Sequence, residues 1–143
     1  MKIPGTKPPA FKNKFMVKFV NVKTGSELEN LPIQVVRAVD GAGEVSMTVE
    51  LDCGLLALKD IAKLKADAKD YVMLICVMDL GSDIGGALAY ENIKVVSDPL
   101  NGMAWDYAEV GTQNMEITVR YETRRVLTSE LMGQLQQILK PPA

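Results

Sequence analysis

Apolar and polar residues alternate most regularly in two stretches of the chain, residues 44–51 and 113–122. Successive side chains of a β-strand point to opposite faces, so each stretch is predicted to be a strand with one buried and one hydrated face. The predicted buried side chains are Val45, Met47, Val49, Leu51, Met115, Ile117, Val119 and Tyr121. The predicted hydrated side chains are Glu44, Ser46, Thr48, Glu50, Glu116, Thr118, Arg120 and Glu122.

Further strands are predicted where short apolar segments are bounded by residues that favour turns. Residues 71–78 are apolar on both faces, as expected of a central strand that a helix covers on one side. Residues 33–39, opened by Leu31-Pro32, and residues 44–51 flank Asp40-Gly41-Ala42-Gly43, which predicts a hairpin because glycine tolerates the positive φ of tight turns. The remaining predicted strands are 15–22, 88–96 and 103–108, the last paired with 113–122, and polar reversals are predicted at 79–86 and 97–102.

Two segments switch to the spacing of an amphipathic helix. In residues 55–70 the predicted buried stripe is Leu58, Ile61, Leu64 and Ala68, and the predicted solvated charges are Lys59, Asp60, Lys63, Asp67 and Lys69. In residues 128–140 the stripe is Leu131, Leu135, Ile138 and Leu139. The second helix is too short to be stable alone, so its stripe is expected to pack on its own sheet or on another subunit.

The 143 residues suffice for one domain with its own core, and 48% hydrophobic and 24% charged residues are ordinary for a globular protein. Residues 1–14, with several prolines and lysines, are predicted to be an arm that does not fold by itself. Residues 15–125 form the predicted β domain and residues 126–143 a C-terminal helical extension. The predicted fold class is mainly β, of α+β type, a sandwich or barrel with one helix between strands.

The chemistry of the chain argues against most enzymes. Histidine is absent, which removes the commonest general base and metal ligand, and we predict no catalytic, metal or cofactor site. The carboxylates of Asp98, Asp106 and Glu109 are too loosely spaced to predict an acid and base pair. The glycines of residues 81–86 lack the spacing and lysine of a phosphate-binding loop. A net charge of −2 argues against a protein that binds nucleic acid by neutralising phosphates.

The two cysteines, Cys53 and Cys76, have no CxxC spacing and are expected to be buried thiols of a reduced protein. The first residues lack the apolar run of a signal peptide, and the longest apolar run, 72–78, is too short to cross a membrane. These features predict a soluble protein made in the cytoplasm. Trp105 and Tyr107 are two residues apart and would share one strand face, where such a pair packs in a core, contacts a subunit or stacks on a ligand.

The order of these elements, and above all the closing segment, resembles a known family. The segment runs from Ala104-Trp105-Asp106-Tyr107 through a short polar break to residues 115–122, MEITVRYE. It resembles the closing hairpin of bacteriophage tail tube proteins, particularly those of contractile tails, and of the related tube protein of type VI secretion systems. The resemblance covers roughly residues 15–125.

The resemblance implies a viral structural protein whose hexameric rings join into a β-barrel around a channel and stack into a tube. It implies a sheath, baseplate and tape-measure protein as partners, DNA that passes without specific binding, and assembly in the host cytoplasm into the virion tail. The candidates for the channel wall are the eight predicted hydrated residues: Glu44, Ser46, Thr48, Glu50, Glu116, Thr118, Arg120 and Glu122. The candidates for contacts between subunits are Asp40, Gly41, Gly43, Gly81, Asp83, Gly85, Leu131, Leu135, Ile138 and Leu139. Arg120 is basic, unlike the charged candidates Glu44, Glu50, Glu116 and Glu122. It therefore leaves open whether the strand at residues 113–122 faces the channel or the outside.

Other functions stay open at this stage. An injection-device tube other than a phage tail, or a baseplate or terminator component, would share the fold and differ in assembly. A monomeric β-barrel would bind a small ligand in a pocket lined by Trp105, Tyr107 and the methionine-rich strands. A hydrolase is disfavoured by the missing histidine.

Overall fold

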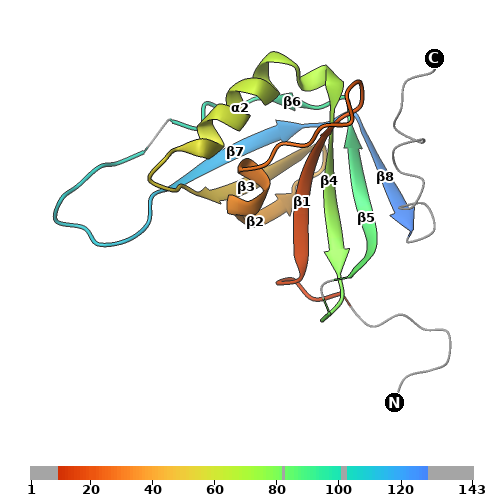
Figure 1. Ribbon diagram of the computed structural model, residues 1–143, viewed down its shortest axis with the longest axis horizontal. Helices are drawn as coiled ribbons and strands as arrows, with labels where there is room; N and C mark the ends of the chain where they lie inside the picture. Colours follow the sequence, from red (N-terminus) through yellow and green to blue (C-terminus); the bar gives the residue numbers. More distant parts are fainter. Residues whose placement is uncertain (1–9, 82, 101–102, 129–143) are drawn as a thin grey trace.

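The computed structural model describes residues 10–81, 83–100 and 103–128. The described chain is built mainly from strands, with one longer helix, α2 (Figure 1). The elements are β1 Phe15–Asn21, α1 Leu31–Gln34, β2 Val35–Asp40, β3 Glu44–Glu50, α2 Leu56–Ala66, a 3-10 turn Ala68–Asp70, β4 Tyr71–Met78, β5 Ile84–Glu91, β6 Lys94–Val95, β7 Asn114–Arg120 and β8 Thr123–Thr128.

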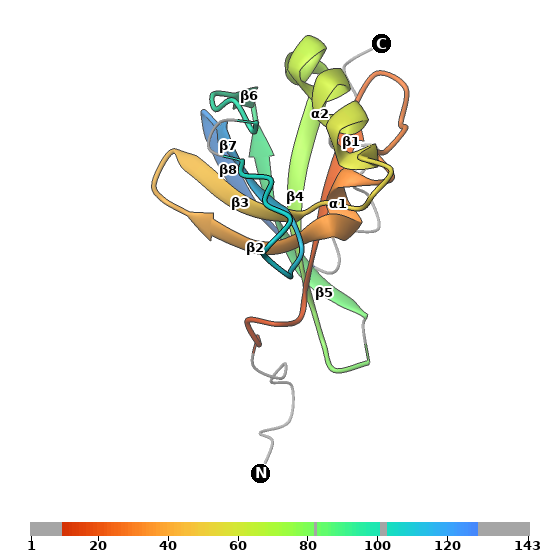
Figure 2. The same ribbon diagram turned by 90° about the vertical axis from the view of Figure 1, so that its left-hand side faces the viewer.

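The strands form two antiparallel sheets of four strands that pack face to face. Sheet A has the order β1-β4-β5-β8 and sheet B the order β2-β3-β7-β6. The main core lies between them and includes Phe19 and Met73 from sheet A and Met47 and Ile117 from sheet B, all almost fully buried. Helix α2 lies across one end of the two sheets (Figures 1 and 2) and contributes Ala57, Ile61 and Leu64 to the same core.

The two alternating stretches are confirmed as β3 and β7, which pair with each other. Their apolar side chains, such as Val45 and Val119, are buried, whereas Glu50 and Glu116 are exposed. The central strand predicted at 71–78 is also confirmed: β4 has these bounds and lies between β1 and β5. The mainly β fold with a helix between strands is therefore correct.

Two predicted strands differ from the structure because the backbone turns inside them. Residues 31–34 are not extended but form α1, whose first turn accepts Pro32 because the missing N–H has no helical partner there. The strand predicted at 88–96 is broken at Asn92, whose φ of 54° lies in the left-handed region. The break lets β5, which starts at Ile84 inside the expected reversal, pair in sheet A while β6 pairs in sheet B.

The prediction of a hairpin at 103–108 is wrong, because these residues form a loop and not a strand. Residues 123–128, for which no strand was predicted, are β8 and pair with β5. Only Leu127 of β8 is buried, so the strand carries almost no alternating pattern. The helix predicted at 128–140 lies outside the described residues beyond Thr128.

The face of sheet A that points away from sheet B carries a second apolar cluster. It consists of Val72, Leu74, Cys76, Ala87, Ala89 and Leu127, and Leu74 and Cys76 are 0% exposed. Val20, Val22 and Ile84 pack against its margin, so every described member comes from sheet A or its ends. These side chains point away from sheet B, so the main core does not cover them.

Asp60 corrects the prediction of a fully solvated charged face on the helix, because it is 4% exposed. Its Oδ2 accepts hydrogen bonds from the backbone N–H groups of Asn30 and Leu31, each at 2.7 Å. These groups begin α1 and have no partner within such a short helix. The carboxylate of α2 therefore fixes the start of α1 and the entry into β2.

We expect Asp60→Ala to lower the free energy of unfolding by about 2 kcal/mol, because two buried N–H groups lose a charged acceptor. Asp60→Asn keeps an acceptor oxygen and should lose less. Urea denaturation monitored by circular dichroism measures both, with Asp67→Ala, an exposed change next to the same helix, as the control. A loss no larger than that of the control would mean that the cap is unimportant.

Candidate assembly surfaces

The outer face of sheet B carries a ladder of paired polar side chains across β3 and β7. The register places Glu44 opposite Arg120, Ser46 opposite Thr118, and Thr48 opposite Glu116. Arg120 Nη2 lies 3.1 Å from Glu44 Oε1, the two hydroxyls of the second pair are 3.5 Å apart, and Thr48 Oγ1 donates to Glu116 Oε1 at 3.4 Å. Cross-strand pairs of this kind stabilise the sheet and fix its register.

The charges on this face are balanced rather than acidic. Arg37 of β2 lies opposite Thr48, and Lys94 of β6 lies opposite Arg120, so both belong to the same face. The face therefore carries three basic side chains, Arg37, Lys94 and Arg120, and three acidic ones, Glu44, Glu50 and Glu116. Arg120 is neutralised locally by Glu44, which explains how it fits on this surface.

Seven of the eight channel-wall candidates lie on this face: Glu44, Ser46, Thr48, Glu50, Glu116, Thr118 and Arg120. The eighth, Glu122, is exposed but follows the end of β7. Arg37 and Lys94 were not among the predicted wall residues, because neither lies in a regularly alternating stretch. Only the pairing of β2 and β6 with their neighbours reveals that they share this face.

Asp40, at the end of β2, holds the two sheets together. Its carboxylate accepts hydrogen bonds from the hydroxyls of Tyr90 at 3.0 Å and Tyr121 at 2.8 Å, and it forms an ion pair with Arg124. Tyr90 and Arg124 belong to sheet A, whereas Asp40 belongs to sheet B and Tyr121 directly follows β7. The two tyrosine rings meet edge to face, with centroids 4.8 Å apart.

This cluster shifts the acidity of its members. Burial of the Asp40 carboxyl would by itself raise its pKa, but the hydrogen bonds from Tyr121, Arg124 and Tyr90 outweigh that effect and the pKa is lowered. Burial, followed by the hydrogen bond to Asp40, raises the pKa of Tyr90. Asp40 is thus charged and Tyr90 neutral at physiological pH, as the cluster requires.

The two glycine-containing turns lie at different edges of the fold. Asp40, Gly41 and Gly43 end β2 and open β3, and the Gly43 N–H donates to Tyr121 Oη at 3.1 Å. Gly81 and Asp83 lie in the β4–β5 turn, where Asp79 Oδ1 accepts from both of their N–H groups, and Gly85 lies within β5. The Asp40 side chain is bound by Tyr90, Tyr121 and Arg124 of the same chain.

The loop between β6 and β7 exposes large apolar side chains. Its part at residues 103–112, called here the 103–112 loop, projects from the body of the protein (Figure 1). Trp105 is 72% exposed, and Tyr107 and Val110 are fully exposed. Two hydrogen bonds hold parts of the loop: Asp106 Oδ1 accepts from Ala108 N at 2.9 Å, and Nε2 of Gln113, which follows the loop, donates to the Ala104 carbonyl at 2.6 Å.

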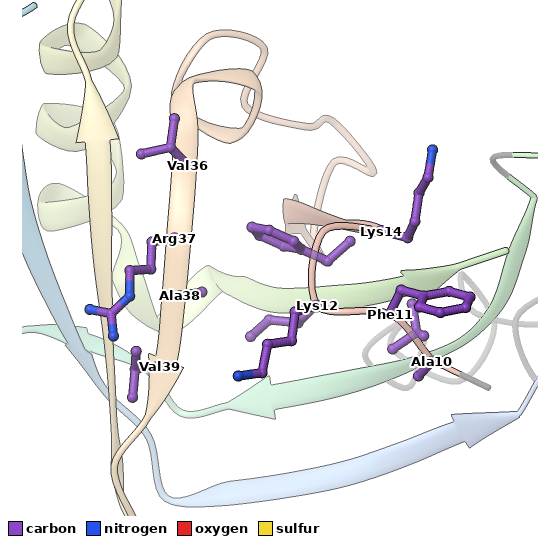
Figure 3. Close-up of a pocket in the computed structure, with 11 residues that line it drawn as sticks. Ala10, Phe11, Lys12, Lys14, Val36, Arg37, Ala38 and Val39 are labelled. Carbon is purple, nitrogen blue, oxygen red and sulfur yellow. The ribbon is translucent and has the colours of Figure 1, made fainter. Parts of the chain in front are cut away.

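A groove opens between the edge strand β2 and residues 10–14, which precede β1; Figure 3 shows it. We call it the β2 groove. Three of its lining residues, Lys12, Lys14 and Arg37, are basic and none is acidic. The other lining residues are Ala10, Phe11, Phe15, Val36, Ala38, Val39, Ile75 and Val77. Most of the lining is therefore apolar, and its charged members are all basic.

The structure does not bring the other chemical candidates together. Trp105 and Tyr107 are neither core residues nor part of the β2 groove, so the pocket expected of a small-ligand barrel lacks its residues. Asp98, Asp106 and Glu109 are exposed. Of the two thiols predicted to be buried, Cys76 is buried but Cys53 is exposed, because it lies in the turn before α2. Within the described residues, no group of His, Cys, Asp and Glu could hold a metal ion.

Solved structures share this arrangement over nearly their whole length. A chain of the anti-feeding prophage baseplate matches 88% of this chain and 100% of its own, with a TM-score of 0.59 and 14% identity. A chain of the PVC sheath-tube complex of an extracellular contractile injection system covers 84% of this chain and 92% of its own, with a TM-score of 0.54 and 12% identity. This chain has the tube-protein fold of contractile injection systems. The Hcp1 protein from E. coli EAEC 042 agrees, covering 82% of this chain and 92% of its own with a TM-score of 0.54 and 13% identity.

The similarity confirms the mainly β fold of one subunit that the resemblance implied. At these identities the similarity lies in the fold and not in conserved side chains. No protein-family model and no curated protein sequence matches the chain. None of the helices in the described parts is long and apolar enough to span a bilayer.

Proposed function

We propose that this protein is a structural subunit of a tube in a contractile injection device, where copies assemble into stacked rings around a channel. The main support is the fold shared over nearly the full length with chains of a sheath-tube complex and a baseplate of such devices. Hexameric rings are part of the proposal, in line with the 6-fold symmetry of the similar baseplate. The protein then belongs to a phage-tail-like particle rather than acting as an enzyme.

In this proposal sheet B lines the channel with its outer face. That face combines three features of a wall exposed to water: exposed strands, paired polar side chains and balanced charge. Closing a sheet into a barrel requires neighbours at both edges, and β2 and β6 are edge strands whose outer sides pair with no described strand. The balanced face would not hold a highly charged cargo such as DNA, which suits passage without specific binding.

The same fold would suit two other positions than a phage tail tube: a baseplate, or the tube of another injection device. The similar chains include one from a baseplate and one from a sheath-tube complex. Sheath, baseplate and tape-measure proteins are the proposed partners in the phage version. These versions differ in how many rings stack, so the length of the assembled particle distinguishes them.

The proposal also assigns a cover to the buried outer face of sheet A. β8 ends at Thr128, one residue after Leu127, a member of that cluster. Residues 128–140 as a helix would be roughly 20 Å long, enough to cross four strands spaced about 4.8 Å apart. We assign the cover to the stripe of Leu131, Leu135, Ile138 and Leu139. The polar side of the segment would then form the outer wall of the tube.

Size-exclusion chromatography and negative-stain electron microscopy of the purified protein test the proposed assembly. Rings or tubes with a central channel are expected across a range of protein concentrations. A protein that remains a 15.6 kDa monomer at all concentrations would overturn the proposal.

A labelled cysteine tests which face lines the channel. In a Cys53→Ser background, a gold-maleimide label at Thr48→Cys on sheet B is expected inside the tube. A label at Lys63→Cys, on the exposed side of α2, is the matched control and is expected outside the channel. Electron microscopy that places the Thr48→Cys label on the outer wall would contradict the orientation while leaving assembly itself intact.

A further inference from the structure

We propose that the 103–112 loop of one subunit docks into the β2 groove of a neighbouring copy of the same chain. The inference rests on the proposed function, because it requires identical subunits to meet in a ring, and it names the surfaces that meet. It starts from two exposed apolar surfaces that have no partner among the described residues.

The loop carries large apolar side chains of the kind that are usually buried in an interface, but they are exposed to solvent. Trp105, Tyr107 and Val110 are exposed together on a loop that hydrogen bonds hold at Asp106 and Ala104. Rigid aromatic side chains lose little conformational entropy when they are buried, and they supply much of the binding energy of interfaces. A loop that presents them together is suited to enter a groove.

The charges of the two surfaces are opposite. The 103–112 loop carries Asp106 and Glu109 and no basic residue, whereas the β2 groove is lined by Lys12, Lys14 and Arg37 and no acidic residue. None of these five side chains forms an ion pair with another described residue. Opposite charge around an apolar contact favours this pairing over contacts between two loops or two grooves.

The loop of one subunit has to bind the groove of another copy, because the two surfaces do not meet within one subunit. No residue of the loop lines the groove of its own subunit. A contact between two different surfaces of identical chains is heterologous, and such a contact closes a ring when its rotation allows. The contact also lies beside β2, an edge strand of sheet B, which the proposed function places next to the neighbouring subunit.

Charge reversal tests this docking, because two variants that fail separately should assemble together. The loop variant Asp106→Lys/Glu109→Lys has a basic loop and a basic groove, and the groove variant Lys12→Glu/Lys14→Glu has an acidic loop and a groove with added acidic side chains. Each alone should self-associate roughly 100-fold more weakly than wild type, because like charges meet at the contact. An equimolar mixture should recover rings, since every contact then joins opposite charges when the variants alternate.

Circular dichroism must show that both variants are folded, and Lys63→Glu/Lys65→Glu on the exposed side of α2 controls for the change in net charge of the groove variant. Rings formed by each variant alone, or a mixture that fails to assemble, would overturn the docking. If wild-type rings form in the same experiment, the proposed function stands without this interface. If wild type forms no rings at any concentration, the proposed function itself fails.

Discussion

Asp40→Ala is expected to lower the free energy of unfolding by about 3 kcal/mol. The substitution removes the acceptor for two tyrosine hydroxyls, and Tyr90 is 0% exposed, so its hydroxyl cannot turn to water. It also leaves Arg124 without the ion pair that joins β8 to β2. Urea denaturation followed by circular dichroism measures the loss.

The contribution of Asp40 should also depend on pH in a defined direction. Because folding lowers the pKa of Asp40, its charged form stabilises the fold above the unfolded pKa of about 4. The difference in stability between wild type and Asp40→Ala should therefore be full at neutral pH and shrink as the pH falls through the lowered pKa. Folding raises the pKa of Tyr90, so its stabilising effect is lost only as the pH rises above about 10.

Graded variants separate the parts of this cluster. Tyr90→Phe and Tyr121→Phe each remove one hydrogen bond and should cost about 1 kcal/mol, while Asp40→Asn keeps an acceptor but loses the charge. Asp83→Ala, an exposed carboxylate in the β4–β5 turn, is the control. If Asp40→Ala destabilises no more than this control, the two sheets are held together by the core without the cluster.

Deleting residues 129–143 is expected to expose the outer face of sheet A and to make Cys76 reactive. In the full chain Cys76 is 0% exposed, and burial raises the pKa of its thiol, so little reactive thiolate is present. A Cys53→Ser background removes the exposed thiol. We expect a disulfide reagent to modify Cys76 at least about 100-fold faster after the deletion. Exposure of Val72, Leu74 and Leu127 should also cost about 3 kcal/mol of stability.

Substitutions within the segment test whether the predicted stripe provides the cover. Leu135→Asp/Leu139→Asp should reproduce the reactivity of the deletion. Gln137→Asp adds an acidic charge on the side of the predicted helix opposite the stripe and should leave Cys76 protected. If Cys76 stays unreactive after the deletion, another part of the chain covers the face, and the assignment of residues 131–139 is wrong. Protection that is lost on dilution would instead point to a neighbouring subunit.

Local patterns in the sequence were sufficient to predict several elements. The period of two in residues 44–51 and 113–122 placed β3 and β7 and the faces of Val45 and Glu116 correctly. The continuous apolar run gave β4 its bounds. The alternation of apolar and polar residues depends only on residues that are neighbours in the sequence. It therefore predicts which face of a strand is buried without knowledge of the residues that pack against that face. The tube-like arrangement itself was suggested by resemblance to a family and not by these patterns.

The tertiary structure alone decided the roles of the polar residues and the division into sheets. Asp60 and Asp40 look like ordinary surface and turn residues, yet their partners Asn30 and Arg124 lie 30 and 84 residues away. The left-handed backbone at Asn92 sends β5 and β6 to different sheets, and pairing with β5 makes β8 a strand despite its weak pattern. Periodicity records whether a residue is buried, but which distant groups meet depends on how the whole chain closes around its core.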